Sequence, residues 1–184
     1  MVEVLCLYGS PRVGGNTETL VRYIARLFED RGFDVTVINL CSLDIKFCRS
    51  CRRCIETGYC SLEDDLSRTV FPKLLSSKAL VLASPVYFNN VSSCVKVFMD
   101  RTWSLRGRLK NVVGGAVVVG RGYGAELAIS AIHSFMLKHD MILCFRGVTG
   151  FAYERGEVLR DKEAFKNANK LVDRMSEVLM KLDG

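Results

Sequence analysis

Long hydrophobic runs are missing from this sequence of 184 residues, which limits the class of protein that it can encode. No apolar stretch approaches the roughly 18 residues that a membrane-spanning helix needs. The first residues also lack the basic segment and the small-residue cleavage site of a secretory signal. We therefore expect a cytoplasmic protein without a membrane partner, and the length predicts one domain, residues 1–184.

Several catalytic and nucleotide-binding motifs are absent as well. The sequence has only two histidines and shows no H-E-x-x-H motif or Ser-His-Asp arrangement, so we assign no catalytic acid or base to the protein. The first glycine-rich turn lacks the G-K-[ST] ending of a P-loop and the G-x-G-x-x-G of a dinucleotide site. The basic residues that give a net charge of +6 are spread along the chain, so we expect no nucleic-acid partner.

What the sequence does contain is an alternation of short apolar runs and amphipathic stretches, the pattern of parallel strands joined by crossover helices. We predict strands at 2–8, 34–40, 79–84, 112–119 and 141–148, and helices at 17–31, 91–105, 125–138 and 162–182. Asn16 is a candidate N-cap for the first helix, and Ser61 with Asp64 is a candidate capping box for a further helix. Ligands of such doubly wound α/β sheets bind beyond the carboxyl ends of the strands.

The turn after the first predicted strand, residues 9–17, has the composition of an anion-binding site. Its glycines let the backbone approach a ligand closely, and the helix that follows directs N–H groups and a positive dipole end toward it. Ser10, Arg12, Asn16 and Thr17 add side-chain donors. The turn therefore predicts a phosphate site, and a capped helix without a ligand is the alternative.

Four of the eight cysteines follow the second predicted strand in a C-x2-C-x2-C-x5-C pattern, here named the cysteine loop, residues 48–60. Thiolates of Cys48, Cys51, Cys54 and Cys60 suit a [4Fe-4S] cluster, and the bacterial ferredoxin motif begins with the same spacing. A zinc site, a redox-active disulfide and a loop without metal are the alternatives. Because cytoplasmic thiols stay reduced, we do not expect a disulfide framework.

Three arginines, Arg49, Arg52 and Arg53, alternate with these cysteines. A cluster held by four thiolates is anionic, so nearby guanidinium groups should raise its reduction potential and offer a docking face for an acidic electron donor. Three solvated arginines without such a role are the alternative.

Two further stretches carry a family resemblance. Residues 84–91 (SPVYFNNV) and 96–101 (KVFMDR), taken with residues 9–17, resemble the flavodoxin-like NAD(P)H-dependent FMN reductases, and the four cysteines narrow the resemblance to the iron–sulfur flavoprotein branch. The resemblance implies an α/β flavodoxin-like three-layer sandwich. Its five-stranded parallel sheet would have the order 2-1-3-4-5 with helices on both faces, and the cysteine loop would be inserted after strand 2.

The resemblance also implies how FMN binds. Ser10, Arg12, Asn16 and Thr17 would hold the phosphate. The isoalloxazine ring would lie along Pro85, Val86, Tyr87, Phe88 and Asn89. The turn formed by Gly120, Arg121, Gly122, Tyr123 and Gly124 is similar to the family's remaining flavin-contacting turn, and Arg121 is a candidate to stabilise negative charge on reduced flavin.

Together these features predict an FMN-dependent oxidoreductase that transfers electrons between a [4Fe-4S] cluster, fed by a ferredoxin-like donor, and FMN. A cluster-free NAD(P)H-dependent reductase of FMN, quinones or nitro compounds is the first alternative. A flavin-binding thiol redox sensor is the second. We further expect a small-molecule electron acceptor and, from the resemblance, a homodimer or homotetramer.

Overall fold

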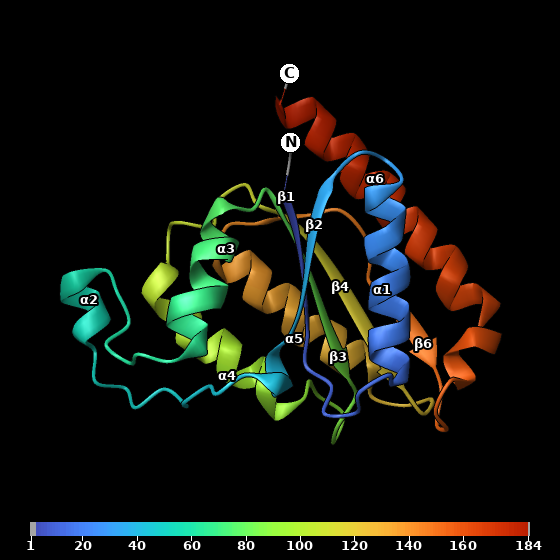
Figure 1. Cartoon of the computed structure of the whole chain (residues 1–184), viewed down its shortest axis with the longest axis horizontal. Helices are drawn as coiled ribbons and strands as arrows, with labels where there is room; N and C mark the ends of the chain where they lie inside the picture. Colours follow the sequence, from blue (N-terminus) through green and yellow to red (C-terminus); the bar gives the residue numbers. More distant parts are fainter. Residues whose placement is uncertain (1–2, 184) are drawn as a thin grey trace.

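The computed structural model describes residues 3–183, and a parallel β-sheet runs through its centre (Figure 1). The strands are β1 (Glu3–Tyr8), β2 (Asp34–Asn39), β3 (Ala79–Pro85), β4 (Val113–Gly120), β5 (Ile142–Leu143) and β6 (Val148–Phe151). Their order is β2-β1-β3-β4-β5, with β6 also paired to β4, and the predicted order 2-1-3-4-5 is confirmed. Val2, predicted to begin the first strand, lies outside the described residues.

The predicted fifth strand is wrong in one respect, because two short strands stand in its place. β5 pairs with Val113 and Gly114 at one end of β4, and β6 pairs with residues 117–120 at the other. Between them the chain leaves the sheet, and Gly147 has a φ of 105°, which residues with a side chain rarely adopt. As a result β6 extends along the carboxyl end of β4 and places the loop that follows at that edge of the sheet.

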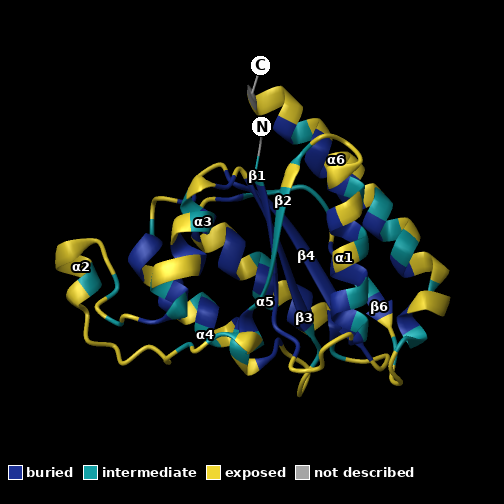
Figure 2. Ribbon diagram, viewed as in Figure 1, coloured by how far each residue is buried: buried dark blue, intermediate teal, exposed yellow. Residues whose placement is uncertain are grey.

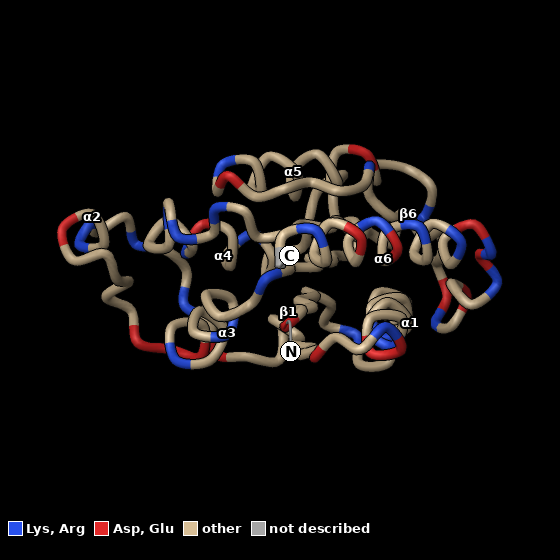
Figure 3. The backbone as a smooth tube through the Cα atoms, turned by 90° about the horizontal axis from the view of Figure 1, so that it is seen from above, with Lys and Arg blue, Asp and Glu red and all other residues tan. Residues whose placement is uncertain are grey.

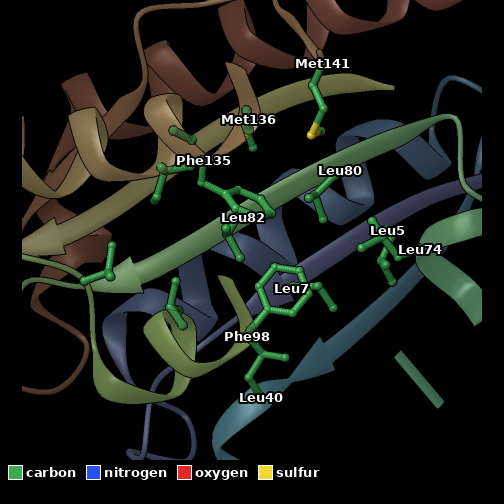
Figure 4. Close-up of a cluster of buried hydrophobic side chains, with 14 of the residues drawn as sticks. Leu5, Leu7, Leu40, Leu74, Leu80, Leu82, Phe98, Phe135, Met136 and Met141 are labelled. Atoms are coloured by element: carbon green, nitrogen blue, oxygen red, sulfur yellow. The ribbon is translucent and has the colours of Figure 1, made fainter. Parts of the chain in front are cut away.

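Helices cover both faces of the sheet and bury two apolar layers. One layer packs under α1 (Asn16–Glu29) and α6 (Lys162–Asp183), and the other under α3 (Phe71–Ser76), α4 (Ser93–Arg101) and α5 (Ala125–Lys138). In Figure 4, Phe98 of α4 lies among Leu7, Leu40 and Leu82 of the second layer. Each fully buried side chain of this size contributes about 1.5–3 kcal/mol to folding. The short elements are α2 (Arg53–Thr57) and the single-turn helices η1 (Leu40–Ser42), η2 (Leu66–Val70), η3 (Thr102–Leu105) and η4 (Glu157–Arg160).

The start of α1 differs from the prediction. The helix begins at Asn16 itself, and Gly15 is the N-cap residue. The Asn16 side chain instead donates a hydrogen bond to the Glu154 carbonyl oxygen at 2.8 Å and accepts one from the Val158 N–H at 3.3 Å. Asn16 therefore joins the first helix to a segment near residue 155 rather than capping it.

The capping box after the cysteine loop also lies three residues later than predicted. Ser67 N donates to Asp64 Oδ1 at 3.2 Å, and Asp64 N donates to Ser67 Oγ at 3.1 Å. This reciprocal pair is the arrangement expected of a capping box. The hydroxyl of Ser61 contacts the sulfur of Cys51 instead, at 3.3 Å.

The cysteine loop lies to one side of the sheet, beyond α3 and α4, and is the most exposed internal segment (Figure 2). Its regular structure is limited to the five residues of α2, which is bounded by Arg52 and Gly58 in the left-handed conformation. Ahead of it, Cys41 in η1 and Cys94 in α4 form a disulfide with a Cα–Cα distance of 5.5 Å. This disulfide departs from the expectation that the thiols stay reduced. No local pattern could predict the pair, because 53 positions separate the two cysteines.

No helix within residues 3–183 is long and apolar enough to cross a membrane. Seen along the sheet, lysine and arginine are distributed over several helices and loops, with acidic residues among them (Figure 3).

Candidate functional site

A cavity of about 580 Å³ opens at the carboxyl ends of β1, β3 and β4, within the range of about 300–1,000 Å³ that is usual for small-molecule sites. Four loops form its wall. The lining residues are Ser10, Arg12, Gly15, Asn16, Thr17, Pro85, Val86, Tyr87, Phe88, Asn89, Val119, Gly120, Arg121, Tyr123, Ala152 and Tyr153. Of the predicted flavin-site residues, only Gly122 and Gly124 are not part of this wall.

The turn after β1 is held in shape by local hydrogen bonds. Ser10 Oγ accepts from the Arg12 N–H at 3.3 Å, and Gly15 N donates to the Arg12 carbonyl oxygen at 3.1 Å. Ser10 and Thr17 are buried, whereas Arg12 is exposed at the mouth of the cavity. The positive end of α1 therefore meets hydroxyl and guanidinium groups at one end of the cavity, an arrangement that suits a phosphate.

The carboxylate of Glu18 stabilises this turn from the helix. It accepts a hydrogen bond from the Gly14 N–H at 2.8 Å and pairs with Arg22 at 2.7 Å. Burial alone would raise the pKa of Glu18, but the hydrogen bonds from Arg22 and Gly14 and the charge of Arg22 hold it below its usual value. Glu18 is thus ionised at neutral pH and keeps Gly14 in its left-handed conformation, with a φ of 64°.

The apolar wall comes from a tight turn after β3. Tyr87 and Asn90 exchange two backbone hydrogen bonds, at 2.9 and 3.0 Å, and the two residues between them have φ values of 49° (Phe88) and 60° (Asn89). A phenylalanine in this conformation is strained, and such strain is concentrated at functional sites. Phe88 is fully exposed, so it does not pack under the next helix, and with Tyr87 it offers aromatic surface to a planar ligand.

The third predicted turn contributes Gly120, Arg121 and Tyr123 to the cavity. Gly124 has a backbone role instead: its φ is 73°, and a Cβ there would lie 2.5 Å from Asn89 Oδ1. Gly122 also has a positive φ, of 122°. Both glycines therefore shape the turn, and Gly124 also lets it approach Asn89, while neighbouring residues face the cavity.

A fourth segment, residues 152–155, was missed by sequence reasoning. Ala152 and Tyr153 line the cavity, and the Tyr153 ring lies 4.2 Å from the guanidinium carbon of Arg121. Arg155 donates hydrogen bonds to the carbonyl oxygens of Val13 and Gly14 in the first turn. The two bonds of Arg155 join positions more than 140 residues apart, so no local pattern could have identified them.

The cysteine loop presents its four thiols without gathering them. Cys48 and Cys51 are exposed, Cys54 and Cys60 are half-buried, and none of them is in a disulfide. Within residues 3–183, no group of three or more Cys, His, Asp or Glu side chains is close enough to hold a metal ion. Four cysteine thiols are the ligands that an iron–sulfur cluster needs, so the residue types fit such a cluster. The loop would have to close to bring the four sulfurs together.

Comparisons with known proteins agree on one family. A family model described as NADPH-dependent FMN reductase matches residues 2–154. An iron–sulfur flavoprotein of Methanocaldococcus jannaschii is 35% identical over 189 aligned positions, which cover 97% of each chain. An iron–sulfur flavoprotein of Methanosarcina thermophila is 30% identical, covering 80% of this chain and 82% of its own.

More distant relatives and solved structures extend the comparison. A putative NAD(P)H-dependent FMN-containing oxidoreductase of Bacillus subtilis is 25% identical over 94% of this chain and 98% of its own. The structure of RosB, solved with a bound riboflavin-phosphate derivative, superposes with a TM-score of 0.82 at 18% identity, over all of this chain and 81% of that one. At this identity the superposition supports the flavodoxin-like fold.

Proposed function

Because the chain belongs to the iron–sulfur flavoproteins of the NADPH-dependent FMN reductase family, we propose that it transfers electrons between a [4Fe-4S] cluster and FMN. The family membership makes it an FMN-binding oxidoreductase. The proposal adds the cluster, the residues that hold each group and the class of electron donor.

The observation that carries the flavin assignment is one cavity with two chemically different ends. At one end lie Ser10, Arg12 and Thr17, which would hold the FMN phosphate at the start of α1. At the other end, Tyr87 and Phe88 present aromatic surface on which the isoalloxazine ring would lie. FMN has these same two parts, an anionic phosphate and a planar ring.

The chain's residues would also adjust the flavin's electronic state. Arg121 lines the cavity, and the ring of Tyr153 limits where its guanidinium can go. The Arg121 guanidinium, held beside the isoalloxazine ring, would stabilise negative charge on reduced flavin. Asn16 contributes indirectly, because both ends of its amide are bonded to residues 154 and 158, which positions the loop that carries Tyr153.

Cys48, Cys51, Cys54 and Cys60 would be the four ligands of the cluster, one thiolate for each iron. When bound, such a cluster supplies one-electron exchange, and flavin accepts one or two electrons. The loop's own part is to hold four free, accessible thiols on one short segment. A hydrogen bond with the Ser61 hydroxyl lowers the pKa of the Cys51 thiol, and the backbone N–H and the charge of Arg53 lower it further. A lower pKa favours the thiolate form that iron needs.

The donor would be a ferredoxin-like protein or NAD(P)H, and the acceptor a small molecule. Arg49, Arg52 and Arg53 are exposed on the cysteine loop and would form a basic docking face for an acidic protein donor. Changing all three to glutamine should slow reduction by ferredoxin at low ionic strength and leave reduction by dithionite unchanged. An unchanged rate with ferredoxin would contradict this docking face.

Anaerobic purification with counts of iron, sulfide and FMN tests the proposed function directly. We expect about four irons per FMN in the wild type after reconstitution. The variant Cys51→Ser should lose most of the iron while FMN stays bound. Serine at Cys144, a free cysteine outside the loop, is the matched control and should leave both counts unchanged. Wild-type protein that takes up FMN but no iron would overturn the cluster assignment.

A second candidate is an NAD(P)H-dependent flavin reductase that works without a cluster. The putative NAD(P)H-dependent FMN-containing oxidoreductase of B. subtilis supports the use of NAD(P)H as donor, since it aligns with nearly the whole chain. Steady NADPH oxidation with an added quinone, at the same rate in wild type and in Cys51→Ser, would favour this candidate. Turnover that needs ferredoxin and is lost in Cys51→Ser would favour the cluster.

A further inference from the structure

Arg101, the last residue of α4, is a buried arginine whose side-chain hydrogen bonds all go to the segment that contains the cysteine loop. It is 2% exposed. Its guanidinium forms a bidentate pair with Asp64, at 2.6 Å from Nη1 to Oδ2 and 3.1 Å from Nη2 to Oδ1, and both side chains are fully buried. A buried charge of this kind is tolerated only where it is paired and its remaining donors are bonded.

The remaining donors reach both ends of the cysteine loop. Nη1 donates to the carbonyl oxygen of Lys46 at 2.5 Å, and Nη2 donates to that of Leu62 at 3.3 Å. Lys46 lies two residues before Cys48, and Leu62 lies two residues after Cys60. One side chain therefore holds together the points where the loop leaves and rejoins the rest of the chain.

The fifth donor is directed at a sulfur. Arg101 Nε lies 3.3 Å from Cys60 Sγ, so all five N–H groups of the guanidinium have an acceptor. Two other arginines also contact the loop. Arg106 donates to the backbone oxygens of Cys54 and Ile55 at 3.5 Å, and the guanidinium carbon of Arg108 lies 5.6 Å from the centre of the Tyr59 ring. Arg101 is thus distinguished by a charged hydrogen bond to a ligand sulfur from a position fixed by Asp64.

We propose that Arg101 is a positioning residue for the cluster: it fixes both ends of the cysteine loop and orients Cys60 through an N–H···S bond. This inference rests on the proposed function. A positive hydrogen-bond donor at a ligand sulfur stabilises the reduced, more negative state of a cluster and raises its reduction potential. Asp64 would act one step further out, by neutralising the buried charge, while the carbonyl oxygens of Lys46 and Leu62 also hold the guanidinium in place.

The test uses the double variant Asp64→Asn/Arg101→Gln, because Arg101→Gln alone would leave a buried carboxylate without its partner. Arg68→Gln is the control, since Arg68 is an exposed arginine near the loop that pairs with Glu63. Asp64→Asn alone removes the ion pair and should keep the contact between Arg101 and Cys60, so it distinguishes the effect of the sulfur bond from that of the ion pair. All proteins are reconstituted anaerobically, and FMN content reports folding because Arg101 does not line the flavin cavity.

We expect the double variant to keep its FMN, lose iron to a chelator at least about threefold faster, and hold a cluster that is harder to reduce. The expected change in the reduction equilibrium is about tenfold, or about 59 mV for a one-electron couple, followed by electron paramagnetic resonance. Arg68→Gln should match the wild type, and Asp64→Asn should keep most of the potential.

Iron content, chelation rate and potential equal to those of the wild type would overturn the role of Arg101 and leave the proposed function standing. Wild-type protein that binds FMN but takes up no iron would overturn the proposed function, and the role toward a cluster with it. Loss of potential in Asp64→Asn as large as in the double variant would also overturn the assignment of the effect to the Cys60 contact.

Discussion

Arg12 is the exposed cation of the phosphate turn, and its removal should weaken FMN binding more than any neutral change nearby. Hydrogen bonds to charged groups contribute about 1.5–3 kcal/mol, so Arg12→Ala should raise the Kd for FMN by about tenfold to a hundredfold. Quenching of FMN fluorescence on binding measures this. Arg26→Ala removes the same charge at the other end of α1, where it is exposed, and should leave the Kd unchanged.

The side chain of Arg155 joins the loop after β6 to the phosphate turn. Its bonds to Val13 and Gly14 hold that turn in the shape that the phosphate would meet. Arg155→Gln should raise the Kd for FMN by about fivefold, since each exposed hydrogen bond contributes about 0.5–1.5 kcal/mol. Arg160→Gln, an exposed charge in η4, is the control. Equal affinities in the two variants would show that the bonds of Arg155 do not support the turn.

These two arginines also show what a sequence can reveal about this site. Ser10, Arg12 and Thr17 were predictable because a strand, a glycine turn and a helix start follow one another locally. Tyr153 and Arg155 were not, because the pairing of β6 with β4 is what brings Tyr153 to the cavity and Arg155 to the phosphate turn. Asn16 lines the cavity as predicted, but its N-cap role was wrong, since its side chain bonds to residues 154 and 158.

At the scale of elements, the turns after β3 and β4 meet at Gly124, where a side chain would collide with Asn89. The Cβ of an alanine would lie 2.5 Å from Asn89 Oδ1 and 2.6 Å from its Cα. Gly58 has the same φ of 73°, and a Cβ there would meet nothing within 4 Å. Gly58→Ala therefore measures the backbone strain alone, without the collision. We expect Gly124→Ala to lower the free energy of unfolding by about 1–3 kcal/mol more than Gly58→Ala. Urea titration of both variants measures the difference.

The disulfide between Cys41 and Cys94 joins two elements that support the phosphate turn. Asn39, two residues before Cys41, donates to the Ser10 carbonyl oxygen at 3.0 Å, and Ser92, two residues before Cys94, donates to that of Gly9 at 2.7 Å. Closing a loop of 53 positions stabilises a protein by up to about 4 kcal/mol in the chain-entropy model. Cys41→Ser should therefore unfold at lower urea concentration.

The reducing agent dithiothreitol provides the control for this prediction. It should bring the wild type close to Cys41→Ser and leave the variant unchanged. A wild type that is equally stable with and without dithiothreitol would contradict the contribution of the disulfide.

Element boundaries illustrate a further limit of prediction from sequence. Apolar runs located the first four strands to within a residue or two, because buried parallel strands are apolar throughout. The same signal joined β5 and β6, since Cys144 and Phe145 are apolar although the chain leaves the sheet there. The capping box is formed by Asp64 and Ser67 rather than by Ser61 and Asp64, and Asp64 also pairs with Arg101, a contact between distant parts of the chain that no local pattern indicates.

For the whole molecule, the ion pair of Asp64 and Arg101 makes stability depend on pH. Burial opposes ionisation of Asp64, but hydrogen bonds from Arg101, Lys46 N and Ser67 N and the charge of Arg101 lower its pKa below the usual 3.8. A carboxyl group whose pKa is lower in the folded state than in the unfolded state makes its full contribution to stability at pH values above its unfolded-state pKa. That contribution is lost as the pH falls through the folded value.

We therefore expect the wild type's free energy of unfolding to fall below pH 3.8 more steeply than that of Asp64→Asn/Arg101→Gln. One extra proton bound on unfolding corresponds to about 1.4 kcal/mol per pH unit. Urea titrations of both proteins between pH 3 and pH 7, read by tryptophan fluorescence, measure the slopes. Because Glu18 is unchanged in both proteins, its own titration cancels in the comparison. Parallel curves below pH 3.8 would mean that Asp64 is not held ionised by Arg101.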